Sequence, residues 1–318
     1  MLKDLKFVQG AVAKKDFIPA LNHFRIENGE IRSFNGTLAL STPIDFDLDC
    51  TPRAEPFVKA IQNCKETVSL NMTPGMRLGI KSGAFKAYIE CVEDETPHVI
   101  PEGEHYNIDG EKLLKAFKVI SPFIGNDASR PWSNGVLLKD GSAFATNNIS
   151  LIEYWIGPEA FPMICNVPKE AIREMVRIGE PPIGMQMTDK SITFHYENKR
   201  WIRSQLLNTD WPDLNALLNA NNNAVPLDET IFDALEVIKP FTDKLGRVYI
   251  RNGAISTSLI KDEGASYDIP DFPYEGVFQL SILNNLKGVA KYIDFTLYPN
   301  PCIFYGENLR GALVGMRS

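Results

Sequence analysis

The residues that could ligate a hard cation stand closest together in the run Asp45–Asp49, which reads Asp-Phe-Asp-Leu-Asp. Alternating carboxylates begin calcium loops, but an EF-hand loop also needs a glycine at its sixth position and a glutamate at its twelfth. This chain has Cys50 and Pro56 at those positions. We therefore interpret the run as a strand whose aspartates face water while Phe46 and Leu48 face inward. The sequence predicts no metal site.

The residues that could act as nucleophiles, general bases or thiol ligands are dispersed. The four histidines are His23, His98, His105 and His195. None pairs with a nucleophile in a known arrangement, and His195 lies in a run typical of a structural strand. The five cysteines are Cys50, Cys64, Cys91, Cys165 and Cys302, with no CxxC pair among them. In a reducing compartment they are expected to be buried free thiols. With no P-loop and no GxGxxG turn opening a helix, we expect no active site and no cofactor.

A threefold repeat indicates which elements the chain must build. Three Asn-Gly or Asp-Gly pairs each precede an alternating run, and their glycines Gly29, Gly141 and Gly253 stand 112 residues apart. Such pairs supply the positive φ angles of tight hairpin turns. Three hairpins at one spacing predict three copies of one structural unit.

Helix-like stretches flank each hairpin. Before the hairpins lie Leu5–Lys15, Glu111–Ser121 and Glu229–Phe241, and after them lie Pro56–Lys65, Pro168–Ile178 and Ser281–Tyr292. Alternating, strand-like runs then close the units at Arg77–Ile89, Ser191–Tyr196, Arg200–Leu207, Asp294–Tyr298 and Leu309–Met316. The order helix, strands, helix, strands therefore occurs three times and predicts an α+β fold with mostly antiparallel sheets.

Linkers between these units are expected at Glu93–Glu104, which is acidic and contains two prolines, and at the polar run Asn219–Val225. They predict three domains, at 1–105, 106–223 and 224–318. No run approaches the ~18 apolar residues of a membrane-spanning helix. The first residues lack the apolar core of a signal peptide, so we expect a cytoplasmic protein that does not enter membranes.

Charge is segregated between these elements. The net charge of −7 and pI of 5.3 by themselves argue against binding to nucleic acid. The helix-like stretches, extended to residues 3 and 228 at two of their starts, hold fifteen basic and eight acidic residues, whereas the remainder holds eighteen and thirty-two. Basic helices in an acidic body suit a ring around DNA, because lysines neutralise phosphates without reading bases. The alternative is that these lysines only solvate helix surfaces.

Five segments resemble the bacterial sliding clamp, the β subunit of the replicative polymerase. Ser129–Leu138 and Phe144–Leu151 resemble the family's R-x-x-L-N-G-V-L strand and its A-T-D-G-H-R-L turn. Val167–Ile172 and Arg203–Leu214 resemble V-P-x-K-x-L and S-x-L-I-D-G-x-F-P-D-Y. Leu313–Ser318 resembles the V-M-P-M-R-L ending. Since the repeat order, repeat size and helix placement also match, the resemblance covers the whole chain.

The resemblance implies a head-to-tail homodimer whose six domains form a ring, with helices lining a central channel that holds double-stranded DNA. It also implies that DNA polymerase and the clamp loader bind a peptide groove between the second and third domains. By position, that groove would use Thr146, Asn148, Ile149, Ser150, Leu151, Leu313, Val314, Met316 and Arg317. DNA contacts would fall on Lys15, Trp132, Lys169 and Arg173, and the charge pattern adds Lys59, Lys115 and Lys287.

The chain departs from the family at the groove. The family's Asp-Gly-His-Arg is Asn147–Ser150 here, and its Met-Pro is Val314-Gly315. The groove keeps its apolar character but loses a histidine and an arginine, so the usual clamp-binding peptide is expected to bind differently or weakly. The chain is also shorter than typical bacterial members, which suggests a divergent clamp of phage or mobile-element origin.

The sequence thus favours a non-enzymatic DNA sliding clamp, a processivity factor that tethers replication and repair polymerases. One alternative is a clamp-fold decoy or interaction protein that binds replication partners without encircling DNA. Another is an enzyme on an unrecognised α+β fold, which would need a cluster of titratable side chains in a deep pocket.

Overall fold

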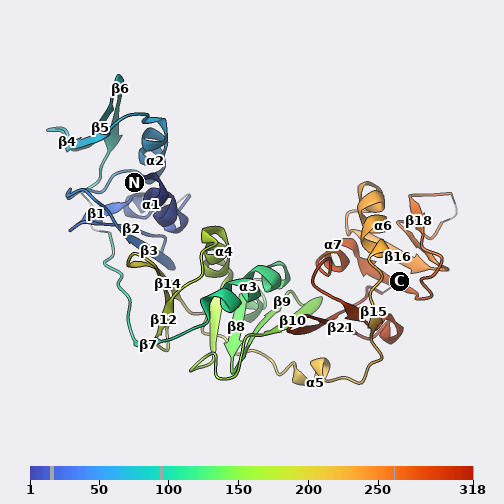
Figure 1. Cartoon of the computed structure of the whole chain (residues 1–318). Coiled ribbons are helices and arrows are strands. Elements are labelled where there is room, and N and C mark those ends of the chain that lie inside the picture. The colour runs from blue at the N-terminus through green and yellow to red at the C-terminus, as the bar shows by residue number, and fades with distance from the viewer. Residues whose placement is uncertain (15–17, 94–95, 261, 318) are drawn as a thin grey trace. The chain divides into compact units, whose positions relative to one another are not determined.

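The computed structural model describes residues 1–14, 18–93, 96–260 and 262–317 (Figure 1). The chain divides into two compact units. Unit 1 comprises Met1–Leu114 and Glu170–Leu207, and unit 2 comprises Lys115–Lys169 and Asn208–Ser318. In both units neighbouring strands pair antiparallel, which confirms the predicted α+β class.

Unit 1 contains a seven-stranded sheet in the order β1-β2-β3-β14-β13-β12-β7 and a three-stranded sheet, β4-β5-β6. The first sheet is formed by β1 (Arg25–Glu27), β2 (Glu30–Phe34), β3 (Leu38–Pro43), β7 (Glu104–Tyr106), β12 (Gly184–Met187), β13 (Ser191–Tyr196) and β14 (Arg200–Gln205). The second is formed by β4 (Ser69–Met72), β5 (Arg77–Ser82) and β6 (Phe85–Glu90). The helical segments are α1 (Leu2–Val8), η1 (Gln9–Ala11), η2 (Pro19–Asn22) and α2 (Ala54–Asn63).

Two helices contain residues of both units. They are α3 (Gly110–Ile120) and α4 (Lys169–Ile178), which agree closely with the predicted stretches at 111–121 and 168–178. Pro168 differs from the expectation: it is the last residue of strand β11 and not part of the first turn of α4.

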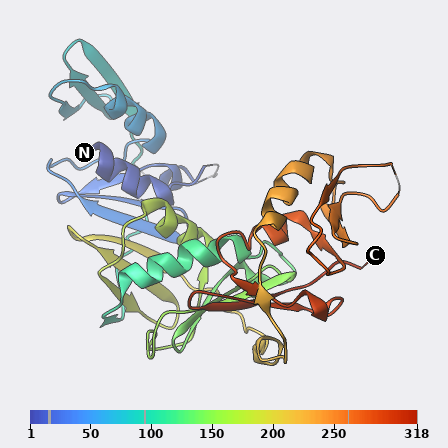
Figure 2. The ribbon, with the colours of Figure 1, turned by 45° about the vertical axis from the view of Figure 1, so that its right-hand side comes forward.

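Apolar helix faces build the core of unit 1. In α1, Leu5, Phe7 and Val8 are buried, and the helix lies across the face of β2 and β3 (Figure 2). The Phe7 ring meets the buried Tyr196 ring edge-on at 5.9 Å between centroids. In α2, Phe57 is fully buried. Side chains three and four apart on these helices share one face, which is why the periodic stretches fold as helices here.

Unit 2 contains an eight-stranded sheet in the order β11-β8-β9-β10-β22-β21-β20-β15 and a four-stranded sheet, β18-β17-β16-β19. The first is formed by β8 (Gly135–Lys139), β9 (Ser142–Thr146), β10 (Ser150–Trp155), β11 (Cys165–Pro168), β15 (Val225–Pro226), β20 (Tyr292–Ile293), β21 (Cys302–Gly306) and β22 (Leu309–Leu313). The second is formed by β16 (Arg247–Arg251), β17 (Ala254–Ser256), β18 (Ser266–Asp268) and β19 (Gly276–Gln279). The helical segments are η3 (Ser121–Phe123), η4 (Pro131–Asn134), α5 (Asn215–Leu218), α6 (Thr230–Ile238), η5 (Lys239–Phe241), α7 (Leu280–Asn284) and η6 (Phe295–Leu297).

All three predicted hairpins form. The two-residue turns join β1 to β2, β8 to β9 and β16 to β17. Asn28 and Gly29 have φ angles of 51° and 71°, and Asn252 and Gly253 have 53° and 71°, as the turn chemistry predicts. In the second hairpin Gly141 has another reason to be glycine: a Cβ atom there would overlap a main-chain carbonyl oxygen, that of Gly157.

Three further local expectations were wrong. The stretch Ser281–Tyr292 is helical only over Leu280–Asn284, because Asn285 and Gly288 (φ 70°) end it early. Asp294–Tyr298 contains a 3-10 turn and not a strand, since the Asp294 carboxylate accepts the backbone N–H of Thr296 at 3.0 Å and caps it.

The aspartate run is the third. Asp45–Asp49 is not a strand, because β3 has already ended at Pro43. The expected alternation of exposure nevertheless holds: the three aspartates are exposed, and Phe46 and Leu48 are half-buried.

The predicted domain boundaries near 105 and 223 remain a prediction. Each large sheet contains strands from two of the three predicted domains: β3 pairs with β14 through Leu40 and Ile202, and β10 pairs with β22. Because neighbouring predicted domains share a sheet, the chain divides into two compact units and not into three. Among the described residues, no helix is both long and apolar enough to cross a bilayer.

Candidate functional site

The predicted groove residues begin at the turn between β9 and β10. The Asn147 side-chain oxygen accepts the backbone N–H groups of Ile149 (3.1 Å) and Ser150 (2.8 Å). The Thr146 hydroxyl donates to the Ser150 carbonyl at 2.7 Å and accepts the Asn148 N–H at 3.1 Å. These side-chain hydrogen bonds take the place of further main-chain hydrogen bonds between β9 and β10. They hold Asn148 at a φ of 69°. The turn is therefore fixed by its own side chains.

The chain terminus packs beside this turn. Strand β22 pairs with β10, with Leu313 opposite Ser150. Beyond it, the Val314 N–H donates to the Ile149 carbonyl at 2.8 Å. The Met316 N–H then donates to the Val277 carbonyl at 2.6 Å. Main-chain hydrogen bonds thus hold the terminal segment at two places in unit 2, the turn before β10 and strand β19.

Tyr298 also holds the terminal segment. Its hydroxyl donates to the Met316 carbonyl at 2.9 Å. A Cβ atom on Gly315 would overlap the Tyr298 ring, so a glycine at this position lets the ring approach. No sequence pattern indicated the roles of Tyr298 or Val277. The Asn147 turn could have been anticipated from the tendency of Asn to bond its own following backbone.

Burial separates the predicted groove residues into two sets. Thr146, Ser150, Leu151 and Leu313 are buried, and Asn148 is half-buried. Ile149 and Val314 are exposed apolar side chains (37% and 38%), Met316 is half-buried and Arg317 is exposed. We call Ile149, Val314, Met316 and Arg317 the tail surface. The buried set lies behind this surface, and Asn148 is partly accessible beside it.

The predicted DNA contacts lie on several helices. Lys15 falls outside the described residues. Lys59 lies in α2, Lys115 in α3 and Lys287 just beyond α7, and all three are exposed. Their Nζ–carboxylate distances are 2.7 Å for Lys59–Glu55, 3.4 Å for Lys115–Glu307 and 3.9 Å for Lys287–Glu236. Exposed pairs of this kind are weak, so they leave the lysines free to exchange a carboxylate for a phosphate.

Trp132 and Lys169 are brought together at one end of the β8–β11 pair, where Gly135 is opposite Pro168. Lys169 donates to the Asn126 side chain. The Trp132 ring meets Trp211 edge-on at 5.2 Å and is half-buried. Its carbonyl accepts a hydrogen bond from the Asn166 side chain at 2.9 Å. Trp132 is thus packed but not fully buried.

Arg173 lies one turn after Lys169 on α4 and is exposed. The other face of α4 is anchored in unit 1 by a buried charge. Glu174 is only 7% exposed and accepts two hydrogen bonds from the Arg177 Nε, at 2.8 and 2.9 Å. Arg177 also donates to the Phe7 carbonyl at 3.1 Å. The anchored face leaves Arg173 on the solvent side.

Two of the four histidines lie together on the large sheet of unit 1. His195 lies in β13 and is half-buried, as the sequence predicted, and its Nε2 bonds the Gln186 side chain at 3.1 Å. The sequence missed that His105 lies against it, with 5.3 Å between ring centroids. Burial, and then the charge of His105, lower the pKa of His195. Within the described ranges, no three His, Cys, Asp or Glu side chains converge as a metal site would require.

The His195 imidazole predicts an acid-sensitive stability. Because its pKa is lower in the folded protein, the unfolded chain takes up the proton first as pH falls through the ordinary value of ~6.5. We expect the melting temperature to be flat above that pH and to decrease below it. His195→Gln should reduce the slope between about pH 7 and about pH 5. An unchanged slope in thermal melts of the variant would contradict this assignment.

Solved structures of bacterial sliding clamps share this fold over the whole chain. A DnaN sliding clamp (DNA polymerase III subunit beta) from Pseudomonas aeruginosa bound to griselimycin matches with a TM-score of 0.83 at 16% identity, covering 100% of this chain and 97% of that one. The clamp from Bacillus subtilis matches with 0.83 at 15% identity and the same coverage. That from Caulobacter crescentus matches with 0.83 at 17% identity, covering 100% and 96%. No protein-family model and no curated protein sequence matches the chain. The chain therefore has the sliding-clamp fold.

Proposed function

We propose that this protein is a DNA sliding clamp, a non-catalytic ring that encircles duplex DNA and tethers replication and repair polymerases. The observation that carries the proposal is the likeness to bacterial clamps, which extends over 100% of this chain and 97% of the Pseudomonas aeruginosa clamp. A match over the full length includes every repeated unit, and a ring needs all of them. The segregation of basic residues to helices is a second, independent support.

Ring closure requires a second copy of the chain, and we propose a head-to-tail homodimer with three domains from each protomer. Exposed apolar side chains support it: Val237, Phe241 and Leu245 are 56%, 59% and 56% exposed, near the end of α6 and in the turn after it. Several large exposed apolar side chains near one helix end are typical of an interaction site. In unit 1, Tyr88 is 61% exposed on β6, an outer strand of the three-stranded sheet. We propose that these two surfaces meet between protomers.

The proposed hold on DNA is electrostatic. Lys59, Lys115, Arg173 and Lys287 are exposed, and their carboxylate partners, where they have them, are exposed too. Contacts between such side chains and phosphates are independent of base sequence, so they allow the ring to slide. Trp132 is half-buried beside Lys169, where a sugar or base could stack.

For the partners, we propose that polymerase and clamp-loader peptides dock on the tail surface. Ile149 and Val314 present adjacent apolar side chains, joined through the Val314–Ile149 main-chain bond. Arg317 adds a positive charge at the edge. A short peptide with apolar anchors and an acidic residue fits this chemistry.

Topological binding tests the proposal. The protein is incubated with nicked circular plasmid, washed at high salt, and then treated with a restriction enzyme that linearises the DNA. A ring should survive the wash and be lost upon linearisation, whereas purely electrostatic binding is lost in the wash. A stable dimer that is never retained on the circle would overturn the clamp and support the decoy, which binds replication partners without encircling DNA.

The role of α4 in DNA contact predicts a salt effect. We expect Lys169→Ala combined with Arg173→Ala to weaken binding to short duplexes equally for all sequences, and to reduce the slope of log K against log salt by about 1 for each lost phosphate contact. Fluorescence anisotropy over a salt series measures both quantities. Lys190→Ala, an exposed lysine in the β12–β13 turn, is the matched control and should leave the slope unchanged. A change in base preference would count against the model.

A further inference from the structure

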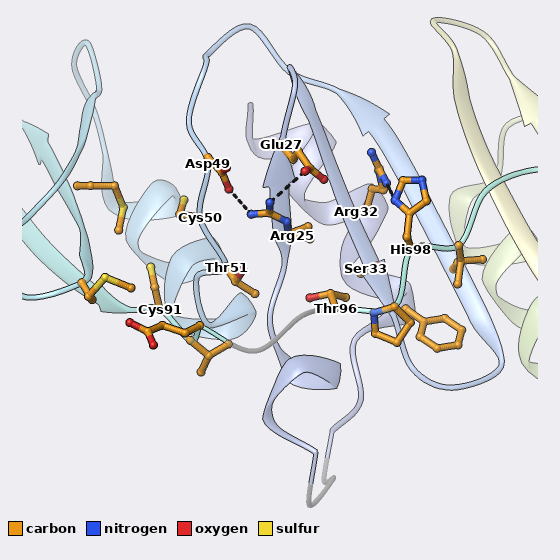
Figure 3. Close-up of a pocket in the computed structure, with 18 of the residues that line it drawn as sticks. Arg25, Glu27, Arg32, Ser33, Asp49, Cys50, Thr51, Cys91, Thr96 and His98 are labelled. Atoms are coloured by element: carbon orange, nitrogen blue, oxygen red, sulfur yellow. Dashed lines mark hydrogen bonds and ion pairs between the residues drawn. The ribbon is translucent and has the colours of Figure 1, made fainter.

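Unit 1 contains a cavity of about 800 Å³, and four sulfur-bearing side chains line it (Figure 3). They are Cys50, Met72, Met76 and Cys91. Cys91 and Met76 also line a neighbouring, smaller cavity of about 430 Å³. Four sulfur side chains around one cavity are unexpected in a chain with only five cysteines and eight methionines.

Three of the four lie in or next to the three-stranded sheet. Met72 is in β4, opposite Leu78 of β5. Met76 lies in the turn that precedes β5, with a φ of 55°, and Cys91 follows β6 directly. The Cys91 thiol donates to the Ile89 carbonyl at 3.8 Å, which holds it beside this sheet.

Cys50 reaches the same place from another segment. Its backbone exchanges two hydrogen bonds with Ile26, at 2.9 and 3.1 Å. The following residue, Thr51, accepts the Val92 N–H at 3.1 Å, which draws the strand of Cys50 alongside that of Cys91. Cys50 and Cys91 therefore line the cavity from neighbouring segments. The main chain thus places two thiols and two thioethers around one cavity.

The chemistry of this cluster selects a soft, singly charged cation. Thiolates and thioethers are the ligands that Cu(I) prefers, whereas Mg²⁺ and Ca²⁺ require oxygen donors. A free thiol is mostly protonated at neutral pH, so a bound cation would replace the protons of Cys50 and Cys91. Arg25, which also lines the cavity, would offset the remaining negative charge.

We propose that Cys50, Cys91, Met72 and Met76 form a binding site for one soft monovalent cation, Cu(I) or its redox-inert analogue Ag(I). Two S–H bonds break and two sulfur–metal bonds form, with both protons released to water and no change of oxidation state. The two thioethers donate as neutral ligands and lose no proton. Binding would fasten the segment of Cys50 to the three-stranded sheet and thereby stabilise unit 1.

Anaerobic titration of the full chain with Cu(I), in competition with the chromophoric chelator bicinchoninate, tests the proposal. One tightly held equivalent is expected, with two protons released per metal ion. Cys50→Ser should remove tight binding, and Cys91→Ser serves if that variant does not fold. Met72→Leu keeps the size and apolar character of the side chain and should weaken binding by at least about 10-fold, the lower end of the effect of losing a supporting partner.

Cys64→Ser is the matched control, because Cys64 is a half-buried thiol at the end of α2 that does not line the cavity. It should bind the metal like the unaltered protein. Three results would overturn the site. The first is binding that depends on Cys64 and not on Cys50 and Cys91, and the second is equal affinity in Met72→Leu. The third is a protein that does not bind Cu(I) tightly but readily forms a Cys50–Cys91 disulfide with oxidised glutathione.

Discussion

Replacing Phe241 and Leu245 together with aspartate is expected to convert the protein from a dimer to a monomer of 35.6 kDa. Both side chains are more than half exposed in the single chain, so aspartate is solvated there and the fold is kept. In the proposed dimer the same positions are covered. A buried, uncompensated charge costs about 3–5 kcal/mol, and 3 kcal/mol raises a dissociation constant by about 100-fold. Light scattering after size exclusion measures the mass directly.

The same double variant should lose retention on circular plasmid while keeping its circular dichroism spectrum and melting temperature. Ile164→Asp is the matched control, because Ile164 is 61% exposed in the loop before β11 and lies outside the proposed interface. It should remain dimeric. If the unaltered protein is already a monomer at micromolar concentration, or if the Phe241 and Leu245 variant stays a dimer, the proposed interface fails.

Gly311→Ala is expected to disrupt the eight-stranded sheet of unit 2. Gly311 lies in β22 opposite Ile152 of β10, and opposite Phe304 of β21. A Cβ atom there would overlap the Leu151 carbonyl oxygen and the Phe304 ring. Phe304 is fully buried and stacks on Phe123 at 6.2 Å, so it has little room to move. Overpacking of this kind costs about 1–3 kcal/mol, and the main-chain overlap places the expected loss of unfolding free energy near the upper end.

Chemical denaturation of the full chain measures that loss. Gly75→Ala is the control, because a Cβ atom there meets nothing within 4 Å and the backbone angle does not require glycine. It should change the free energy of unfolding little. If Gly311→Ala is as stable as Gly75→Ala, then β10 and β22 tolerate separation. In that case their pairing is not what holds the two chain segments of unit 2 together. The tail surface should be affected as well, since Val314 follows β22 directly.

Local chemistry accounts for the elements that the sequence predicted well. The stretches 111–121 and 229–241 are helical within a residue or two of their predicted bounds, because their apolar residues recur at helical spacing and a polar residue precedes each. The hairpins form at Asn28-Gly29 and Asn252-Gly253 because few other pairs adopt two positive φ angles cheaply. These features depend on residues only a few positions apart.

The failures came where distant contacts or a single capping residue decided the outcome. Asp294 caps a short 3-10 turn and ends β20, although its neighbours alternate like a strand. His105 and His195 are 90 positions apart in the chain, yet β12 brings their rings together by pairing with both β7 and β13. Leu313 is fully buried, which its place in an alternating run could not reveal. No local pattern contains that information.

The sequence by itself determined the repeated hairpins, the antiparallel α+β class and the surplus of basic residues on helices, since each depends on local propensity or on composition. Only the tertiary structure decided which of those residues are accessible. It joined β3 to β14 and β10 to β22, buried Leu151 and Leu313, left Phe241 and Leu245 exposed, and gathered Cys50, Cys91, Met72 and Met76 around one cavity. The physical reason is that strand pairing and burial are set by partners far away in the chain, whereas turns and helix faces are set by neighbours.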